Sequence, residues 1–411
     1  MRILYSIAIF FYGFGIRIAS LFDEKAKQWV RGRKNIFISL SSTFANSDKR
    51  PVWVHCASLG EYEQAKPLIE KIKTENPQTK IIATFFSPSG YSQAIKNSLA
   101  DYCFYLPLDT VHNAKKFINI VNPEAVFFVK YEFWFNYMYF LHKKNVPFYY
   151  ICAIFRENQH FFKKYGKWFA KQLNSASHFF VQNKKSKSLL KSIGIDQSTI
   201  CGDTRFDRVV KIAENAQPLT FMEKFAGNKR LIVAGSSWQP DEQLLSELLQ
   251  GLNNYKLVVT PHEISRTEEL IKTFSKFKTA RYSKMNVEYL EDYDVLIIDT
   301  VGLLSRLYRY SYVSYIGGAF KTGLHNILEA AVYGKPLFFG PNYDHFNEAV
   351  ELVAKGGAFS IDFSQEMMRV LRDFDETPQL YTETCRICEQ YVADNSGSAD
   401  LIYEHVKNQI Q

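Results

Sequence analysis

The stretch PVWVHCASLGEYEQAKPLIEKIK, residues 51–73, contains a strand, a turn and a helix in close succession. The apolar run VWVHC predicts a buried strand, and the residues Ser58-Leu59-Gly60 predict a turn. Apolar side chains then recur at helical spacing and form a face that packs on a sheet: Tyr62, Ala65, Leu68, Ile69 and Ile72. The stretch therefore predicts a strand and a helix, with Glu61 on the first turn of that helix.

A glutamate in this position has two explanations. An acidic side chain on the first turn stabilises the positive end of the helix dipole and caps free amides, which contributes up to about 1 kcal/mol. Alternatively, Glu61 acts as a general base that takes a proton from an acceptor hydroxyl, an effect worth roughly 10²- to 10⁴-fold in rate. The position of Glu61 in the sequence leaves both explanations open.

Short apolar runs alternate with helical segments along most of the chain. Six such runs lie between residues 52 and 183, and six more lie between residues 230 and 361. Continuous apolar strands that alternate with helices indicate a parallel sheet covered on both faces. We therefore predict an α/β protein with two Rossmann-like, doubly wound domains that face one another across a cleft, where ligands bind at the carboxyl ends of the strands.

The predicted domain boundaries follow this pattern. Residues 1–34 form an apolar, membrane-associated helix with a basic flank, and residues 35–205 form the first Rossmann-like domain. Residues 206–228 are a linker, and residues 229–362 form the second Rossmann-like domain. Residues 363–411 are helical, with packing back on the first domain as one possibility.

Charge is divided unequally between the two halves of the chain. Residues 1–200 contain 28 Lys and Arg against 13 Asp and Glu, a net charge of +15, whereas residues 201–411 have a net charge of −7. This asymmetry indicates an anionic partner for the first half: nucleic acid, a membrane surface or a phosphorylated substrate. Nucleic acid is disfavoured because the sequence contains no recognised binding motif.

The first 34 residues favour a membrane surface. Residues 3–22 are apolar apart from Arg17 and are long enough, as a helix, to match the core of a bilayer. The flank that follows is basic and suits an anionic cytoplasmic leaflet: Lys25, Lys27, Arg31, Arg33 and Lys34. A helix buried on its own domain is the alternative, and the sequence does not separate a spanning helix from an interfacial one.

The cysteines indicate neither a disulfide framework nor a metal site. Four of the six are scattered singly near strands, as small buried side chains are. Cys385 and Cys388 have the spacing of metal ligands, but no second pair accompanies them, and tetrahedral zinc needs four ligands. We therefore expect no metal and no cofactor, and a reducing compartment.

A second informative stretch is SYIGGAFKTGLHNILEAAVYGKPLFFGP, residues 314–341. Gly317 and Gly318 follow the predicted strand of this stretch, and glycines let the backbone approach a ligand closely. A helix is predicted to begin near His325 and Asn326, with free amides that hold a phosphate. Glu329, one turn into that helix, is placed to accept hydrogen bonds from ribose hydroxyls.

The motifs together resemble those of the 3-deoxy-D-manno-octulosonic acid (Kdo) transferases of lipopolysaccharide biosynthesis. The resemblance runs through nearly the whole chain and includes these segments: HCASLGE (55–61), FFSPSG (85–90), EFWFN (132–136), GDTRFD (202–207) and GLHNILEAA (323–331). It implies the GT-B glycosyltransferase fold and an inverting, metal-independent transfer of Kdo from CMP-Kdo to a lipid A precursor, lipid IVA. It also implies a location on the cytoplasmic face of the inner membrane of a Gram-negative bacterium.

The resemblance also implies roles for individual residues. Glu61 matches the family's catalytic base. Contacts to the CMP of the donor are expected from these positions: Thr260, Pro261, His262, Val301, Gly302, Leu303, Gly318, His325, Asn326, Ile327, Leu328 and Glu329. Three positions depart from the family's pattern: Lys130, Pro261 and Leu303.

Further contacts to acceptor or donor are expected in the first half of the chain. Glu132 lies in the EFWFN motif, and Arg205 is either a phosphate contact or an ion-pair partner of Asp203 or Asp207. Lys163 and Lys164 belong to the segment FFKKYGKWFAK, whose lysines are predicted to lie near one helix face and to receive the phosphates of the acceptor. A solvated amphipathic helix explains that segment equally well.

Two other functions remain open on the sequence. One is a GT-B transferase that uses a UDP-sugar and a lipid-linked acceptor, which would bind UDP better than CMP. The other is a membrane-surface scaffold without enzymatic activity, for which Glu61 and the segment HNILE are dispensable.

Overall fold

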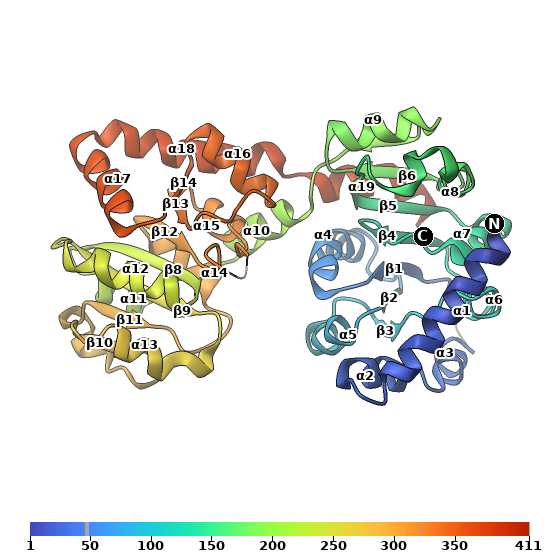
Figure 1. The fold of residues 1–411 in the computed structure, drawn as a ribbon, viewed down its shortest axis with the longest axis horizontal. Helices are drawn as coiled ribbons and strands as arrows, with labels where there is room; N and C mark the ends of the chain where they lie inside the picture. The colour runs from blue at the N-terminus through green and yellow to red at the C-terminus, as the bar shows by residue number, and fades with distance from the viewer. Residues whose placement is uncertain (46–48, 322, 411) are drawn as a thin grey trace. The chain divides into compact units, whose positions relative to one another are not determined.

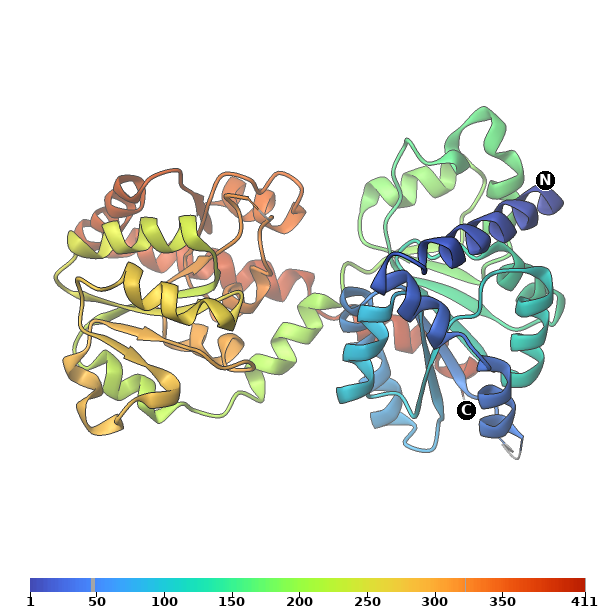
Figure 2. The same ribbon diagram turned by 60° about the horizontal axis from the view of Figure 1, so that its bottom comes forward.

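The computed structural model describes residues 1–45, 49–321 and 323–410. The chain divides into two compact units: unit 1 comprises residues 1–208 and 396–411, and unit 2 comprises residues 209–395. Each unit contains a parallel sheet of seven described strands with helices on both faces (Figures 1 and 2). The predicted α/β class and the two doubly wound sheets are therefore confirmed.

The sheet of unit 1 has its first strand near the centre. From edge to edge its strands are β3 (Tyr102–Tyr105), β2 (Ile81–Phe85), β1 (Val52–Cys56), β4 (Ala125–Val129), β5 (Phe148–Ala153), β6 (His178–Val181) and β7 (Ser198–Ile200). The chain moves outward in one direction through β2 and β3, and in the other direction from β4 onward. The switch point therefore lies between β1 and β4, and in such sheets the crevice outside the carboxyl ends there is the usual ligand site.

Helices cover both faces of this sheet. One face packs against α4 (Leu59–Glu75), α5 (Pro88–Ala94) and α19 (Ser398–Val406). The other face packs against α3 (Ile36–Phe44), α6 (Val111–Val121), α7 (Phe135–Lys143), α8 (Lys167–Leu173) and α9 (Lys184–Ser192). Strand β1 is buried at every position, because alternate side chains enter the cores on the two faces.

The apolar N-terminal helix α1 (Arg2–Ala19) is attached to unit 1 by polar contacts at its start. Tyr5 donates a hydrogen bond to the buried carboxylate of Asp109 (2.7 Å), and Arg2 donates one to Asn136 (3.2 Å). Asp109 also accepts hydrogen bonds from the main-chain amides of Asn136 and Tyr137. By length and composition α1 is the one helix of the described residues that is able to cross a membrane.

Most of the apolar side chains of α1 remain uncovered by the protein. Only Gly13 is buried, and it lies so close to Leu108 that a larger side chain would collide with it. Leu4, Phe11 and Phe14 are more than half exposed. The short helix α2 (Glu24–Gly32) follows and carries the basic flank, so the apolar surface of α1 and the basic flank adjoin one another on unit 1.

The sheet of unit 2 repeats the same arrangement. Its strand order is β10 (Thr279–Arg281), β11 (Val295–Ile297), β9 (Tyr255–Pro261), β8 (Arg230–Ser237), β12 (Val313–Ile316), β13 (Leu337–Phe339) and β14 (Ala358–Ser360). Its helices are α11 (Thr220–Ala226), α12 (Gln239–Gln250), α13 (Thr267–Thr273), α14 (Leu304–Leu307), α15 (Leu328–Ala331), α16 (Asn347–Lys355), α17 (Ser364–Glu376) and α18 (Pro378–Asn395). The switch point lies between β8 and β12.

The segments expected to be a linker and a helical tail contain ordered elements. Residues 206–228 hold most of α10 (Arg205–Glu214) and all of α11, whose Phe221, Met222 and Phe225 are buried. Helices α17 and α18 belong to unit 2, whereas α19 returns to unit 1. There the apolar side chains of the last residues enter the core beside α4: Ile402, Tyr403, Val406 and Ile410.

Candidate functional site

Glu61 lies at the switch point of unit 1, on the first turn of α4. Ser58 ends the turn after β1, and its hydroxyl accepts a hydrogen bond from the Glu61 amide (3.4 Å). The Oε2 atom of Glu61 accepts a hydrogen bond from the amide of Ala57 (2.5 Å). Within the described part of the chain, Oε1 of Glu61 accepts no hydrogen bond. The carboxylate therefore caps the turn with one oxygen, while the other has no hydrogen-bond partner among the described residues.

Burial gives this carboxyl group an unusual acidity. The Glu61 side chain is only 7% exposed. Burial, together with the negative charge of Glu132, raises the pKa of Glu61 to about 7, against the opposing effects of the Ala57 amide and the Lys130 ammonium. A carboxylate whose pKa lies near the working pH is suited to general base catalysis, because it is ionised and still basic enough to take a proton.

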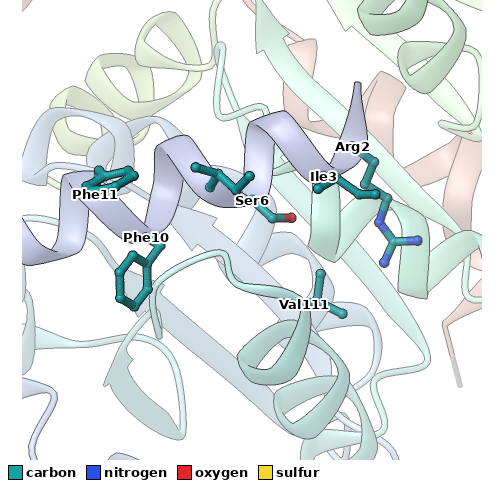
Figure 3. Close-up of a pocket in the computed structure, with 7 residues that line it drawn as sticks. Arg2, Ile3, Ser6, Phe10, Phe11 and Val111 are labelled. Carbon is teal, nitrogen blue, oxygen red and sulfur yellow. The ribbon is translucent and has the colours of Figure 1, made fainter.

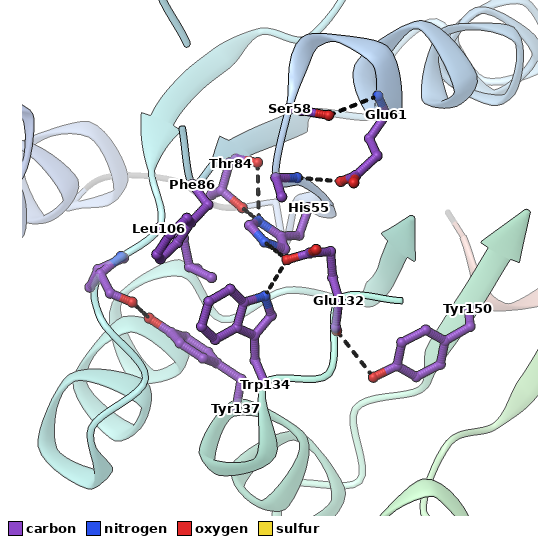
Figure 4. A network of polar contacts seen from close by, with 12 residues as sticks. His55, Ser58, Glu61, Thr84, Phe86, Leu106, Glu132, Trp134, Tyr137 and Tyr150 are labelled. Atoms are coloured by element: carbon purple, nitrogen blue, oxygen red, sulfur yellow. Dashed lines mark hydrogen bonds and ion pairs between the residues drawn. The ribbon is translucent and has the colours of Figure 1, made fainter. Parts of the chain in front are cut away.

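A polar network of His55, Glu132 and Trp134 lies beside Glu61, which makes its own hydrogen bonds within the turn after β1 (Figure 4). Glu132 follows β4 and accepts a hydrogen bond from the Trp134 indole (2.9 Å). His55, the fourth residue of β1, is fully buried, and its Nε2 lies 3.4 Å from Glu132 Oε2. Its Nδ1 lies 2.9 Å from the hydroxyl of Thr84 on β2. The network therefore fixes Glu132 beside Glu61 at the edge of three neighbouring strands.

His55 and Trp134 are members of this network that the sequence did not single out. Both belong to motifs that were recognised, HCASLGE and EFWFN, but no local pattern says that the two rings meet. In the structure their centroids lie 5.9 Å apart in an edge-to-face arrangement. Their meeting depends on the order of β1 and β4 in the sheet, which is a long-range property.

In unit 2, three aromatic rings gather at the carboxyl ends of adjacent strands. Trp238 follows β8, His262 follows β9, and His325 lies in the loop after β12. The ring of His262 stacks on Trp238 with centroids 4.9 Å apart, and on His325 with centroids 4.5 Å apart. Burial and the neighbouring His262 lower the pKa of His325. Both histidines were predicted donor contacts, whereas Trp238 was not.

The other predicted donor contacts lie around this stack. Thr260 and Pro261 end β9, and the exposed Val301 lies with Gly302 and Leu303 in the loop after β11. The hydroxyl of Thr260 is buried and has no hydrogen-bond partner among the described residues. The carboxyl ends of β11, β9, β8 and β12 thus bring most of the predicted donor contacts to one edge of unit 2.

The helix expected near His325 and Asn326 begins later and is short. Helix α15 spans Leu328–Ala331, and the Oδ1 atom of Asn326 accepts a hydrogen bond from the Leu328 amide (3.2 Å). Ile327 lies directly before the helix and is buried, like Leu328, whereas Asn326 is exposed. The side-chain amide nitrogen of Asn326 also donates a hydrogen bond to the carboxylate of Glu329 (3.1 Å). Asn326 therefore caps a single turn, which begins two residues after the predicted position, and the first amide of that turn is bonded to the cap.

The glycines before this loop are required by the backbone. Gly318 has a φ of +98°, and a Cβ atom there would lie 2.4 Å from the carbonyl oxygen of Gly323. Its amide donates to the carboxylate of Asp241 (3.1 Å). Gly318 therefore shapes the loop, and its amide is already engaged with the protein.

Arg205 and the lysine segment occupy distinct places on unit 1. Arg205 donates to Asp203 (2.9 Å), whose carboxylate also accepts hydrogen bonds from Gln64 and Gln182. This geometry matches the structural ion pair that was one of the two explanations. Lys163 and Lys164 precede α8, yet they line one cavity of about 540 Å³ together with Lys167 and Lys171.

Among the described residues, no group of three or more His, Cys, Asp or Glu side chains has an arrangement able to hold a metal ion. The Cys388 thiol, one of the spaced pair, is buried and donates a hydrogen bond to the carbonyl of Gly357 (3.1 Å). Cys388 is thereby part of the packing of unit 2.

Comparison with known proteins relates the chain to one family. Residues 32–208 match the family model described as 3-deoxy-D-manno-octulosonic-acid transferase. The 3-deoxy-D-manno-octulosonic acid transferase of Aquifex aeolicus is 26% identical over 336 residues, which are 79% of this chain and 86% of that protein. A bifunctional glycosyltransferase/methyltransferase of Fusobacterium nucleatum is 23% identical over 86% of this chain, but the match spans only 56% of that protein's length.

Solved structures with the same fold are more distant in sequence. The UDP-GlcNAc 2-epimerase of Neisseria meningitidis superposes with a TM-score of 0.63 over 87% of this chain and 100% of that chain, at 17% identity. At that identity the likeness concerns the fold alone, which is that of the GT-B glycosyltransferases.

Proposed function

Because the chain is a GT-B glycosyltransferase related to the Kdo transferases, we propose that it transfers Kdo from CMP-Kdo to a lipid A precursor, lipid IVA. The observation that carries the proposal is Glu61, a buried carboxylate at the switch point of unit 1 whose pKa is raised to about 7. It combines the position of a ligand-binding residue with the acidity of a general base.

In the proposed reaction, Oε1 of Glu61 takes the proton of an acceptor hydroxyl as that oxygen attacks the anomeric carbon of Kdo. The bond from the anomeric carbon to the CMP phosphate breaks, and the electron pair leaves with CMP. Attack from the face opposite the leaving group inverts the anomeric configuration. Neutral Glu61 then returns its proton to solvent.

The other parts of the site have supporting roles in this scheme. Glu132, held by Trp134, keeps the pKa of Glu61 high and is placed to bind an acceptor hydroxyl. In unit 2 the stack of Trp238, His262 and His325 offers flat faces for a nucleotide base, and aromatic stacking on a base contributes about 1–3 kcal/mol.

The acceptor's chemistry fits the surface of unit 1. A phosphorylated, acylated sugar needs a surface that is both basic and apolar. Lys163, Lys164, Lys167 and Lys171 line one cavity, and helix α1 exposes a row of apolar side chains. We further propose that the exposed apolar side chains of α1, with Lys25 and Lys27 of the basic flank, hold the protein on the cytoplasmic leaflet of the inner membrane, where such an acceptor is found.

The activity test uses the full chain with CMP-Kdo generated in place and tetraacylated, diphosphorylated glucosamine disaccharide in nonionic detergent. Formation of the Kdo-bearing lipid is the expected result. UDP-sugars supplied in place of CMP-Kdo are expected to give no product. Transfer from a UDP-sugar but not from CMP-Kdo would instead establish the alternative donor class.

A binding test separates the donor classes without catalysis. We expect CMP to raise the melting temperature of the protein more than UDP does at equal concentration, because a ligand that binds only the folded state stabilises it. The variant His262→Ala loses the central ring of the stack and should lose most of that stabilisation. Tyr289→Ala, an exposed aromatic position before the amino end of β11, is the matched control and should keep it.

A further inference from the structure

Unit 1 contains a cavity that the proposed chemistry does not use. It has a volume of about 810 Å³, within the range of small-molecule sites, and lies between α1, α2, the start of α3 and residues 107–113. Apolar side chains form part of its wall, among them Phe10, Trp29 and Leu108. Four basic side chains form another part: Arg17, Arg31, Arg33 and Lys34. No carboxylate lines it among the described residues, and we call it the basic cavity.

The basic side chains fall into two classes. Arg33 is engaged with the protein, because it donates to the carbonyls of Trp29, Phe86 and Leu106 and its guanidinium lies 3.7 Å from the Trp29 ring centre. Arg17, Arg31 and Lys34 are exposed and make no side-chain hydrogen bond or ion pair within the described part of the chain. Three positive charges are therefore left without a protein counter-charge around one hollow, which favours an anionic ligand.

A buried hydrogen-bond donor belongs to the same cavity. Trp29 lines it and is only 9% exposed, yet its indole N–H has no partner among the described residues. A buried donor without a partner destabilises the fold, so a ligand oxygen that accepted this hydrogen bond would be favoured. Trp29 thus supplies an observation independent of the charges: a buried donor without a partner among the described residues, in the wall of the same cavity.

An apolar hollow adjoins the basic cavity. It has a volume of about 670 Å³ and lies between α1 and the start of α6 (Figure 3). Its lining is mainly apolar (Ile3, Ile7, Phe10, Phe11 and Val111), with Ser6 and with Arg2, whose guanidinium is engaged with Asn136 and Tyr139. Phe10 lines both hollows. We call this second hollow the α1 pocket. A ligand able to fill both must carry an anionic group at one end and hydrocarbon at the other.

A chain of aromatic rings leads from the basic cavity to the Glu61 network. The Trp29 ring lies 5.6 Å from Phe86, and Phe86 lies 5.1 Å from Trp134. Trp134 in turn donates to Glu132, which raises the pKa of Glu61. Phe86 directly follows β2, next to β1 in the sheet, so the cavity and the proposed base are reached from the same edge of unit 1.

We propose that the basic cavity holds a phosphate of the acylated acceptor and that the α1 pocket holds its hydrocarbon. This inference rests on the proposed function, since it names the subsite that presents the acceptor sugar to Glu61. Nearness to the Glu61 network favours the acceptor over a bilayer phospholipid, because a lipid bound only for anchoring has no need to lie beside the reacting carboxylate.

The test measures binding of two lipids to the full chain in nonionic detergent without donor. The probes are tetraacylated glucosamine disaccharide with both phosphates and the same lipid without phosphate. The variant Arg31→Glu/Lys34→Glu reverses two free charges of the cavity and should weaken binding of the diphosphorylated lipid at least ~10-fold. Binding of the lipid without phosphate should not change. The control Lys96→Glu/Lys184→Glu reverses two exposed charges outside the cavity and should bind both lipids as the wild type does.

The kinetic counterpart is a rise in KM for the diphosphorylated acceptor of at least ~10-fold with kcat within about 2-fold, because Glu61 is untouched. Unchanged affinity in the variant, or an equal loss for both lipids, overturns the inference. So does a loss seen only with phosphatidylglycerol vesicles, which would make a bilayer headgroup the occupant. A wild type that binds the diphosphorylated lipid but transfers no Kdo contradicts the proposed function alone, because the binding comparison still decides the subsite.

Discussion

Glu61 has two charged neighbours that act on its pKa in opposite directions. Glu132 raises it and Lys130 lowers it, while burial supplies the largest upward effect. Lys130 is one of the positions at which the sequence departs from the family's pattern, where a glutamate is usual. The Lys130 ammonium therefore cancels part of the rise in the Glu61 pKa that burial causes. A larger fraction of Glu61 is then ionised at neutral pH.

These signs predict the pH dependence of catalysis. A general base works only when ionised, so kcat/KM should rise as pH increases through about 7, the pKa of Glu61. Glu132→Gln removes a negative neighbour, lowers that pKa and should move the rise to lower pH. Lys130→Gln removes a positive neighbour and should move it to higher pH. The measurement is kcat/KM between pH 5 and 9 for the three proteins, and shifts of the same sign in both variants would contradict the assignment.

The Glu61 carboxyl group should also make the stability of the protein depend on pH, in the direction opposite to that of the activity. The folded-state pKa of Glu61 lies above the ordinary value of 4.5, so the folded protein binds more protons than the unfolded chain between about 4.5 and 7. Its contribution to the free energy of unfolding is therefore largest below this window and declines as pH rises through it. Asp109, whose pKa burial also raises to about 7, adds to the same decline.

The site residues differ in how far the sequence could identify them. Glu61 was identifiable because a strand, a turn and a helix start lie within a few residues of one another. His55 and Trp238 were not, because each gains its neighbours only when strands distant in sequence pair. His325 and His262 were identified by motif, but their stacking depends on the adjacency of β9, β8 and β12.

At the level of elements, alternation of apolar runs and helical segments predicted the strands well because buried parallel strands are short and continuously apolar. Helix boundaries were harder. The helix after Asn326 is a single turn that begins at Leu328, whose amide donates to the Asn326 side chain. Residues 206–228 were expected to be a linker, and the structure places most of α10 and all of α11 in them, with Phe221, Met222 and Phe225 of α11 buried.

Helix α19 completes the core of unit 1 from the far end of the chain. Ile402 is fully buried in the core beside α4, whereas its neighbour Leu401 is 39% exposed on the same helix. Ile402→Ala should lower the free energy of unfolding by about 2–5 kcal/mol, and Leu401→Ala by less than about 0.5 kcal/mol. Urea denaturation followed by fluorescence gives both values. Equal effects would show that α19 does not contribute to this core.

For the whole molecule, the distribution of charge and exposed apolar surface predicts membrane binding. Residues 1–200 carry a net charge of +15, and α1 exposes its apolar side chains beside the basic flank. Binding to vesicles that contain phosphatidylglycerol should therefore occur and should weaken as salt is raised, because ions screen charges beyond about 10 Å at 0.1 M.

A pair of variants separates the insertion of α1 into the bilayer from the electrostatic attraction of the whole protein to anionic vesicles. Phe14→Asp/Leu21→Asp places charges on exposed apolar positions of α1 and the turn after it, and should reduce vesicle binding at least ~10-fold. Tyr289→Asp/Leu380→Asp makes the same change at exposed positions of unit 2 and should leave binding unchanged. Co-sedimentation with vesicles measures both. Equal losses in the two variants would mean that net charge alone decides binding.

The central claim is that Glu61 is the base of a Kdo transfer, and one comparison tests it most directly. Wild type and Glu61→Gln are assayed for transfer of Kdo from CMP-Kdo to the tetraacylated acceptor at pH 8, with melting temperatures to establish that both are folded. Glutamine keeps the size of the side chain and an oxygen for the Ala57 amide. We predict a kcat at least roughly 100-fold lower for Glu61→Gln. Activity within a few-fold of wild type in the folded variant would contradict the claim and leave Glu61 as a helix cap.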